Sequence, residues 1–242
     1  MDIVTKYKST VFRNRAFRTN IFFVHTLYDS CAKSFLMKVG KNMDNCSIVK
    51  KVFQTSPYGI AKTAAFLEHG MTNSEVRRLC QQGIIKNVRH GFYQLVEGAD
   101  ATEEQLLATL LPEGILCVES ALFQYGYIAR PPKQWHVAVP RTVTRSKLQI
   151  PTLEINAYYV QAEQYELGKN NVRINDVTLS MYDRERTICD CYKYRHKLGS
   201  KILNKAMHAY VADEEKNLIA LPKYAKKMRV YRGVMELMEV LL

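Results

Sequence analysis

The sequence predicts an α+β protein, in which an N-terminal winged helix-turn-helix precedes a mixed α/β domain with a small sheet and several helices. Two short helical runs surround a glycine at Gly70, and two extended runs joined by a turn at His90-Gly91 follow directly. Beyond residue 100, apolar runs of strand length are mixed with longer helical patterns. A winged helix-turn-helix lays one helix in the major groove, so the first two observations favour DNA binding.

The segment before the motif is predicted to be a helix over residues 43–54, with an apolar stripe at Ile48, Val49 and Phe53. The run from Ser56 to Gly59 should end it, because proline and glycine break a helix.

The first helix of the motif is expected over residues 62–68, with Ala64, Ala65 and Leu67 facing inward. Gly70 follows where a helix ends in a left-handed residue, which glycine adopts without steric cost.

The second helix of the motif is predicted to read DNA. Its N-cap is Thr72, Asn73 or Ser74, all residues that accept backbone N–H groups. One face is apolar, and the other carries polar and basic side chains at four-residue steps. The apolar face consists of Val76, Leu79 and Cys80, and the polar face of Asn73, Arg77 and Gln81 with Ser74 and Arg78 beside them.

A hairpin should follow, with Ile84-Ile85 in the first strand and Phe92 to Leu95 in the second. Its basic residues gather toward the tip, where a wing would meet the duplex backbone. A solvated basic surface on a small helical domain is the alternative. The residues predicted to contact DNA are Lys62, Thr72, Asn73, Ser74, Arg77, Arg78, Gln81, Lys86, Arg89 and His90.

The net charge of +12 is unevenly distributed along the 242 residues. Residues 1–99 hold 15 Lys and Arg against 6 Asp and Glu, whereas residues 100–242 hold 20 against 17. A basic N-terminal half favours a polyanionic partner. Residues 1–42 alone carry 8 basic and 2 acidic residues, so the winged helix-turn-helix region itself is only mildly basic. The argument for DNA binding therefore rests on where its basic residues lie more than on total charge.

Three segments are predicted. Residues 1–42 form a poorly ordered basic leader, with a DNA-touching arm as the alternative; residues 43–98 form the winged helix-turn-helix; and residues 100–242 form the α+β domain. The loop from Glu97 to Asp100 marks the boundary. The six cysteines show no C-x-x-C pair and are expected to be free thiols in a cytoplasmic protein. No apolar run is long enough to span a membrane.

The C-terminal domain should contain several helices and a few strands. Asp183 is expected to cap a helix, and the apolar tail from Val234 to Leu242 predicts either a homodimer or docking onto the core. The expected helices cover residues 102–111, 119–125, 184–194, 201–211, 218–227 and 231–242. The expected strands cover residues 135–139, 153–160 and 172–181, the last with a turn at Asn175-Asp176.

The order of these motifs resembles the AbiEi-type antitoxins of bacterial abortive-infection systems, over residues 43 to about 215. The matching stretches are Gly83-Ile84-Ile85 and Gly91-Phe92-Tyr93, Glu119 to Leu122 before Tyr125-Gly126, Trp135 to Pro140, Tyr182 to Asp190, and Tyr194 to Gly199. The resemblance implies a protein that represses its own operon by binding its operator as double-stranded DNA. It also implies an antitoxin domain that counteracts a nucleotidyltransferase-like toxin without a stable complex.

The sequence contains no catalytic, metal-binding or nucleotide-binding motif of the common kinds, so no enzyme activity and no cofactor are expected. The residues Asp183, Arg186, Thr187 and Asp190 are predicted to form a structural motif, in which a cap accompanies a buried ion-pair network. Two alternatives remain: a winged-helix protein-interaction module without DNA binding, and a metal-dependent nuclease. The carboxylates of such a nuclease would be Glu154, Asp176, Asp183, Glu185 and Asp190.

Overall fold

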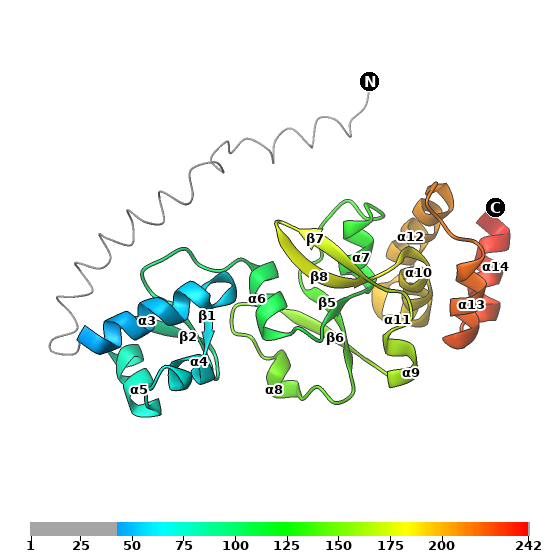
Figure 1. The fold of residues 1–242 in the computed structure, drawn as a ribbon. Coiled ribbons are helices and arrows are strands. Elements are labelled where there is room, and N and C mark those ends of the chain that lie inside the picture. The colour runs from blue at the N-terminus through cyan, green and yellow to red at the C-terminus, as the bar shows by residue number, and fades with distance from the viewer. Residues whose placement is uncertain (1–42, 242) are drawn as a thin grey trace, which may run out of the picture.

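The structure, a computed structural model, describes residues 43–241, so the predicted leader lies outside the described residues. It is a mixed α+β protein with two small sheets (Figure 1). The first part contains α3 (Met43–Thr55), the 3-10 helix η1 (Pro57–Gly59), β1 (Ile60–Lys62), α4 (Thr63–Glu68), α5 (Asn73–Gln81), β2 (Ile85–Arg89) and β3 (Phe92–Leu95).

The second part follows a short connection. It contains α6 (Glu103–Leu110), β4 (Ile115–Leu116), α7 (Val118–Gln124), β5 (Trp135–Pro140), α8 (Arg145–Leu148), β6 (Ile155–Val160), α9 (Ala162–Tyr165), β7 (Lys169–Ile174), β8 (Val177–Tyr182), α10 (Arg184–Lys193), α11 (Arg195–Leu198), α12 (Ser200–Ala212), α13 (Ala220–Lys227) and α14 (Tyr231–Leu241).

Helices α3, α4 and α5 pack around a core centred on Phe66, which is fully buried between the rings of Phe53 and Tyr93. The expectation that Ala64 and Leu67 face inward is wrong, because both side chains are exposed, Leu67 by 43%. The helix begins at Thr63 and has only six residues, so its buried face includes Phe66 in place of Leu67.

The small sheet has the strand order β1-β3-β2, and the predicted hairpin forms its β2 and β3. The sequence did not predict β1, which pairs antiparallel with β3. The register of β2 shifts between Asn87 and Arg89, which makes Val88 an extra residue in a bulge. Val88 and Ile60 are buried in a core cluster that belongs mainly to the second part. The hairpin is therefore docked against the second part.

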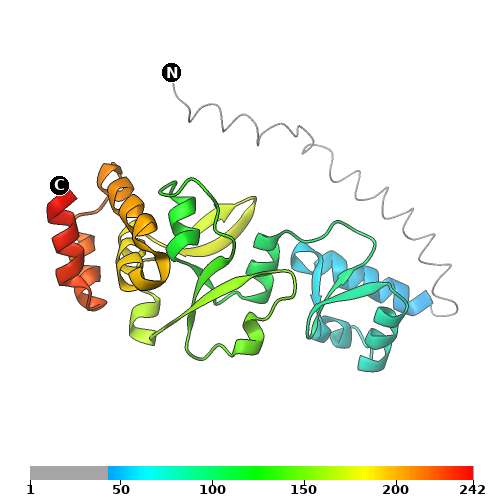
Figure 2. The ribbon, with the colours of Figure 1, turned by 180° about the vertical axis from the view of Figure 1, so that it is seen from behind.

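The five-stranded sheet has the order β6-β5-β4-β8-β7 and mixes parallel and antiparallel pairs. Along β5, Val137 and Val139 join the cluster that contains the leucines of α6, whereas Ala138 joins the cluster on the opposite face. This alternation follows from side chains pointing to opposite faces along a strand. Both faces are therefore covered, α6 on one and α7 and α10 on the other, with α12 and α13 packed against α10 (Figure 2).

Several predicted helix ends and turns are confirmed. Thr102 caps α6 with a reciprocal bond to Gln105, and Asp183 caps α10 by accepting the Arg186 N–H at 2.8 Å. The turn at Asn175-Asp176 joins β7 to β8 through two residues with positive φ.

The C-terminal helix α14 docks back onto the core through Val234 and Met238, which are both buried. Docking onto the core was one of the two alternatives predicted for the apolar tail. Its outward-facing Val240 is 82% exposed. None of the described helices has the length and apolar character that crossing a membrane requires.

Candidate functional site

Helix α5 begins at a capping box. The Thr72 hydroxyl accepts the Glu75 N–H at 3.3 Å, and the Glu75 carboxylate accepts the Thr72 N–H at 2.8 Å. This backbone hydrogen bond is the main reason that the pKa of Glu75 is lowered. Of the three residues predicted as the N-cap, Thr72 is therefore the one that caps α5, and its hydroxyl is already hydrogen-bonded to Glu75.

The two faces of α5 divide as the sequence predicts. Val76 and Leu79 are buried, whereas Asn73, Arg77 and Gln81 are exposed at four-residue steps. Within residues 43–241, these three side chains make no hydrogen bond or ion pair, so their polar groups are available to a partner. Ser74 and Arg78 are exposed on the adjacent face, and the charge of Arg78 contributes to the low pKa of Glu75.

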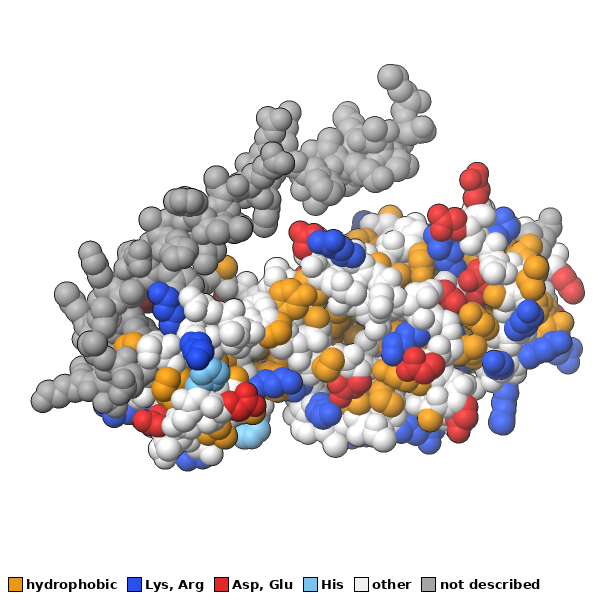
Figure 3. Space-filling model, in the orientation of Figure 1, with side chains coloured by type: hydrophobic (Ala, Val, Ile, Leu, Met, Phe, Trp, Pro, Cys, Tyr) orange, Lys and Arg blue, Asp and Glu red, His pale blue; other side chains and the backbone are white. Residues whose placement is uncertain are grey.

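The other basic residues predicted for the interface lie in varied surroundings. Lys62 is exposed at the end of β1, with its ammonium 5.7 Å from the centre of the Phe92 ring. Lys86 is paired with Asp100 in the connection between the two parts. His90 is exposed in the turn of the hairpin. Figure 3 shows Lys and Arg side chains in blue and His side chains in pale blue at the end of the molecule formed by α3, α4 and α5.

Arg89 lies beside the turn of the hairpin, as the sequence predicts, but its guanidinium is bound to the second part of the chain and is not free to meet a duplex as expected. Its guanidinium donates hydrogen bonds to the carbonyl oxygens of Leu110 at 2.7 Å and Lys147 at 2.9 Å. It also stacks 4.6 Å from the centre of the Phe92 ring. The bulge at Val88 turns this end of β2 toward the second part, and partial burial lowers the pKa of Arg89. Arg89 therefore connects the two parts of the chain.

Replacing Arg89 with alanine should lower the free energy of unfolding by about 1–3 kcal/mol, because two carbonyls lose a charged donor. Urea denaturation of the full chain measures this. Lys86→Ala is the matched control on the same strand, since its exposed pair with Asp100 contributes about 0–1 kcal/mol. Equal stability of Arg89→Ala and the parent protein would contradict the connecting role.

The predicted structural motif on α10 is brought together as an ion-pair network. Arg186 is fully buried and its Nε donates to the Asp190 carboxylate at 3.1 Å. Its Nη1 donates to the carbonyls of Gln164 and Leu167, so the guanidinium holds α9 and the loop between α9 and β7. Thr187 donates to the Tyr182 carbonyl at 3.4 Å. Burial raises the pKa of Asp190 to about 6, although Arg186 acts in the opposite direction.

The five carboxylates considered for a nuclease do not converge. Asp183 caps α10 and accepts from the Tyr224 hydroxyl, and Asp190 pairs with Arg186. Asp176 pairs with Arg173 at the exposed turn. Glu185 accepts from the Tyr210 hydroxyl and the Asn217 N–H, and Glu154 lies near Gln134. In the part of the chain that the structure describes, no group of three or more His, Cys, Asp or Glu residues could hold a metal ion.

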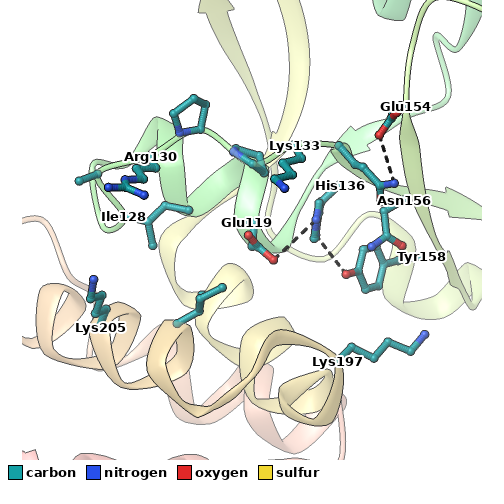
Figure 4. Close-up of a pocket in the computed structure, with 15 residues that line it drawn as sticks. Glu119, Ile128, Arg130, Lys133, His136, Glu154, Asn156, Tyr158, Lys197 and Lys205 are labelled. Atoms are coloured by element: carbon teal, nitrogen blue, oxygen red, sulfur yellow. Dashed lines mark hydrogen bonds and ion pairs between the residues drawn. The ribbon is translucent and has the colours of Figure 1, made fainter.

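A pocket of about 760 Å³ lies between α7, the loop before β5, β6 and the helices α11 and α12 (Figure 4). His136 is buried in its floor, where its Nδ1 lies 3.1 Å from the Tyr158 hydroxyl and its Nε2 lies 3.7 Å from the Glu119 carboxylate. Burial lowers the pKa of His136 to about 4 and raises that of Glu119. The histidine is therefore neutral at pH 7, and the tautomer with its proton on Nε2 suits both neighbours, because Nδ1 can then accept from the Tyr158 hydroxyl while Nε2–H faces Glu119.

Sequence reasoning did not assign this pocket. His136 is a polar residue in an otherwise apolar strand, which is the one signal that the sequence offers. Its partners come from α7 and β6, and only the folded sheet brings those residues together.

The buried His136 should make stability depend on pH. Its folded pKa is about 4 and its unfolded pKa is 6.5, so the unfolded chain binds a proton first as the pH falls. His136 should therefore destabilise the protein by about 2–3 kcal/mol between pH 6.5 and 4. Urea denaturation of the parent and of His136→Asn across this range isolates the effect. A stability difference between the two that stays constant with pH would contradict it.

Comparisons with known proteins concern the fold. The sequence matches no family model and no curated protein. The structure resembles the crystal structure of the RV2827C protein from Mycobacterium tuberculosis with a TM-score of 0.59 and 14% sequence identity. The match covers 82% of this chain and 77% of that chain. At this identity the likeness shows a shared fold.

Proposed function

We propose that the protein is a DNA-binding transcriptional regulator, with α4, α5 and the β2–β3 hairpin acting as a winged helix-turn-helix. The observation that carries this proposal is the polar face of α5. Asn73, Arg77 and Gln81 are exposed in one row and unpaired within the described residues, while the opposite side of the helix is anchored by Val76 and Leu79. A rigid helix with free donors is suited to reading base edges in a major groove.

The roles of the two arginines of α5 should differ. Neighbouring residues point about 100° apart on a helix. Arg77 shares its face with Asn73 and Gln81 and should look into the groove, whereas Arg78 shares its face with Ser74 and should lean toward phosphate. The docked hairpin leaves His90 as the exposed basic group of the turn, so phosphate contacts fall mainly to α5 and to Lys62. Phosphate contacts fix register, and base contacts specify sequence.

The proposal extends to an antitoxin role because the resemblance to AbiEi-type antitoxins spans both parts of the chain. In this role the protein represses its own operon and counteracts a nucleotidyltransferase-like toxin without a stable complex. Co-expression with a nucleotidyltransferase-like neighbouring gene tests this part. Growth should be restored without co-purification of the two proteins, and continued toxicity would count against the antitoxin role.

The DNA-binding proposal is tested with the full chain and labelled duplexes. The duplex just upstream of its own gene should be bound more tightly than a scrambled duplex of equal length. Affinity should fall steeply with salt. In a plot of the logarithm of the binding constant against the logarithm of the salt concentration, each neutralised phosphate contributes a slope of about −0.9. Absence of binding to either duplex at low salt would leave α5 as a protein-interaction surface. Magnesium-dependent cleavage of the duplex would favour a nuclease instead.

A further inference from the structure

The pocket around His136 combines three kinds of wall. Its mouth carries four basic side chains, its floor carries hydrogen-bonding groups, and one side is apolar. The basic residues of the mouth are Arg130, Lys133, Lys197 and Lys205, and the lining also holds two carboxylates, Glu119 in the floor and the exposed Glu154. In Figure 4, Lys197 and Lys205 rise from the helices, and Arg130 and Lys133 from the facing loop.

The basic side chains of the mouth are available to a ligand. Arg130, Lys133 and Lys205 are exposed, and none of them has an ion-pair partner among residues 43–241. Lys197 lies 5.8 Å from the centre of the Tyr158 ring, which leaves its ammonium close to the floor without a carboxylate partner. These four cations outnumber the two carboxylates of the lining, Glu119 and Glu154, so the opening favours a ligand with several negative charges, such as a di- or triphosphate.

The floor requires a different ligand chemistry. The Glu119 carboxylate accepts hydrogen bonds, and the Asn156 amide both donates and accepts. His136 is held in one orientation by the Tyr158 hydroxyl. A purely anionic ligand would be repelled by Glu119, so the buried end of the ligand must carry donors, such as sugar hydroxyls or an amino group. The apolar side formed by Ile128 and Pro132 offers a surface for a flat ring.

We propose that this pocket binds a mononucleotide, with its phosphates at the basic mouth and its ribose and base against the floor and the apolar side. A cavity of about 760 Å³ lies within the range of roughly 300–1,000 Å³ that is usual for small-molecule sites. The pocket is too small for a duplex. All of its lining residues lie between Glu119 and Lys205, so the site is separate from the α5 surface and does not depend on the DNA-binding proposal.

Isothermal titration calorimetry of the full chain without DNA tests the proposal. ADP and ATP are the probes, and pyrophosphate, adenosine and ribose 5-phosphate are the partial ligands. ADP and ATP should bind, and each partial ligand should bind roughly tenfold or more weakly, because it lacks one set of contacts. No heat of binding for either nucleotide up to roughly 1 mM would overturn the proposal. Pyrophosphate binding as tightly as ADP would overturn the assignment of the floor to ribose and base.

Variants locate the binding. Lys197→Ala and Lys205→Ala lie at exposed positions on the mouth, and each should weaken ADP binding roughly tenfold. Asn156→Ala should weaken ADP while leaving pyrophosphate unchanged. Lys223→Ala, an exposed lysine on α13 outside the pocket, is the matched control and should bind ADP like the parent. If ADP binds equally to the parent, Lys197→Ala and Lys205→Ala, the nucleotide lies elsewhere and the proposal fails.

Discussion

Replacing Arg186 with alanine should lower the free energy of unfolding by about 3–5 kcal/mol, the cost of leaving one member of a buried ion pair alone. Arg186 is fully buried, and its guanidinium lies 4.2 Å from the centre of the Tyr182 ring. Its loss would leave Asp190 buried without its cation and would release the carbonyls of Gln164 and Leu167. Urea denaturation followed by far-UV circular dichroism measures the change.

Two controls accompany this variant. Arg232→Ala removes an arginine from an i,i+4 pair with Glu236 that is exposed to solvent, so it should change stability little. The double variant Arg186→Met, Asp190→Leu removes both charges. It should lose less stability than the summed losses of the single variants Arg186→Met and Asp190→Leu. Additive losses would show that Arg186 and Asp190 are not coupled, against the geometry of α10.

Phe66→Ala should be comparably destabilising, by about 3–5 kcal/mol, because it leaves a cavity in the core of α3, α4 and α5. The ring of Phe66 contacts Phe53 and Tyr93 at centre-to-centre distances of 5.8 and 5.9 Å. This cluster holds α5 in place through Val76 and Leu79, so DNA binding should weaken with it. Differential scanning calorimetry and duplex titration on the same samples measure the two effects.

The neighbouring residue supplies the control for Phe66. Leu67 belongs to the same helix and is 43% exposed. Leu67→Ala should therefore leave both stability and DNA affinity close to those of the parent. A larger loss for Leu67→Ala than for Phe66→Ala would contradict the observed orientation of α4.

Local signals in the sequence predicted three helix caps and one turn correctly. Thr72, Thr102 and Asp183 each cap the helix that follows, and the turn at Asn175-Asp176 uses residue types that tolerate positive φ. These features depend on residues only a few positions apart. The exposed face of α5 follows equally from local helical spacing.

The features that the sequence did not predict depend on contacts between distant segments. Arg89 was expected to be free, but its partners Leu110 and Lys147 lie 21 and 58 residues further along the chain. The pocket needs His136 from β5, Tyr158 from β6 and Lys205 from α12 together. The short strand β1 forms through its pairing with β3, about 30 residues away, rather than through its own composition.

The central claim, that the polar face of α5 reads DNA sequence, is tested most directly by titrating Arg77→Ala and Arg78→Ala against operator and scrambled duplexes at several salt concentrations. Arg77→Ala should lose about 1–3 kcal/mol on the operator and relax specificity at one base pair, because it removes a base contact. Arg78→Ala should weaken both duplexes alike and reduce the salt slope by about one ion, as expected for a phosphate contact. If Arg77→Ala weakens both duplexes equally, α5 does not read the sequence in this way.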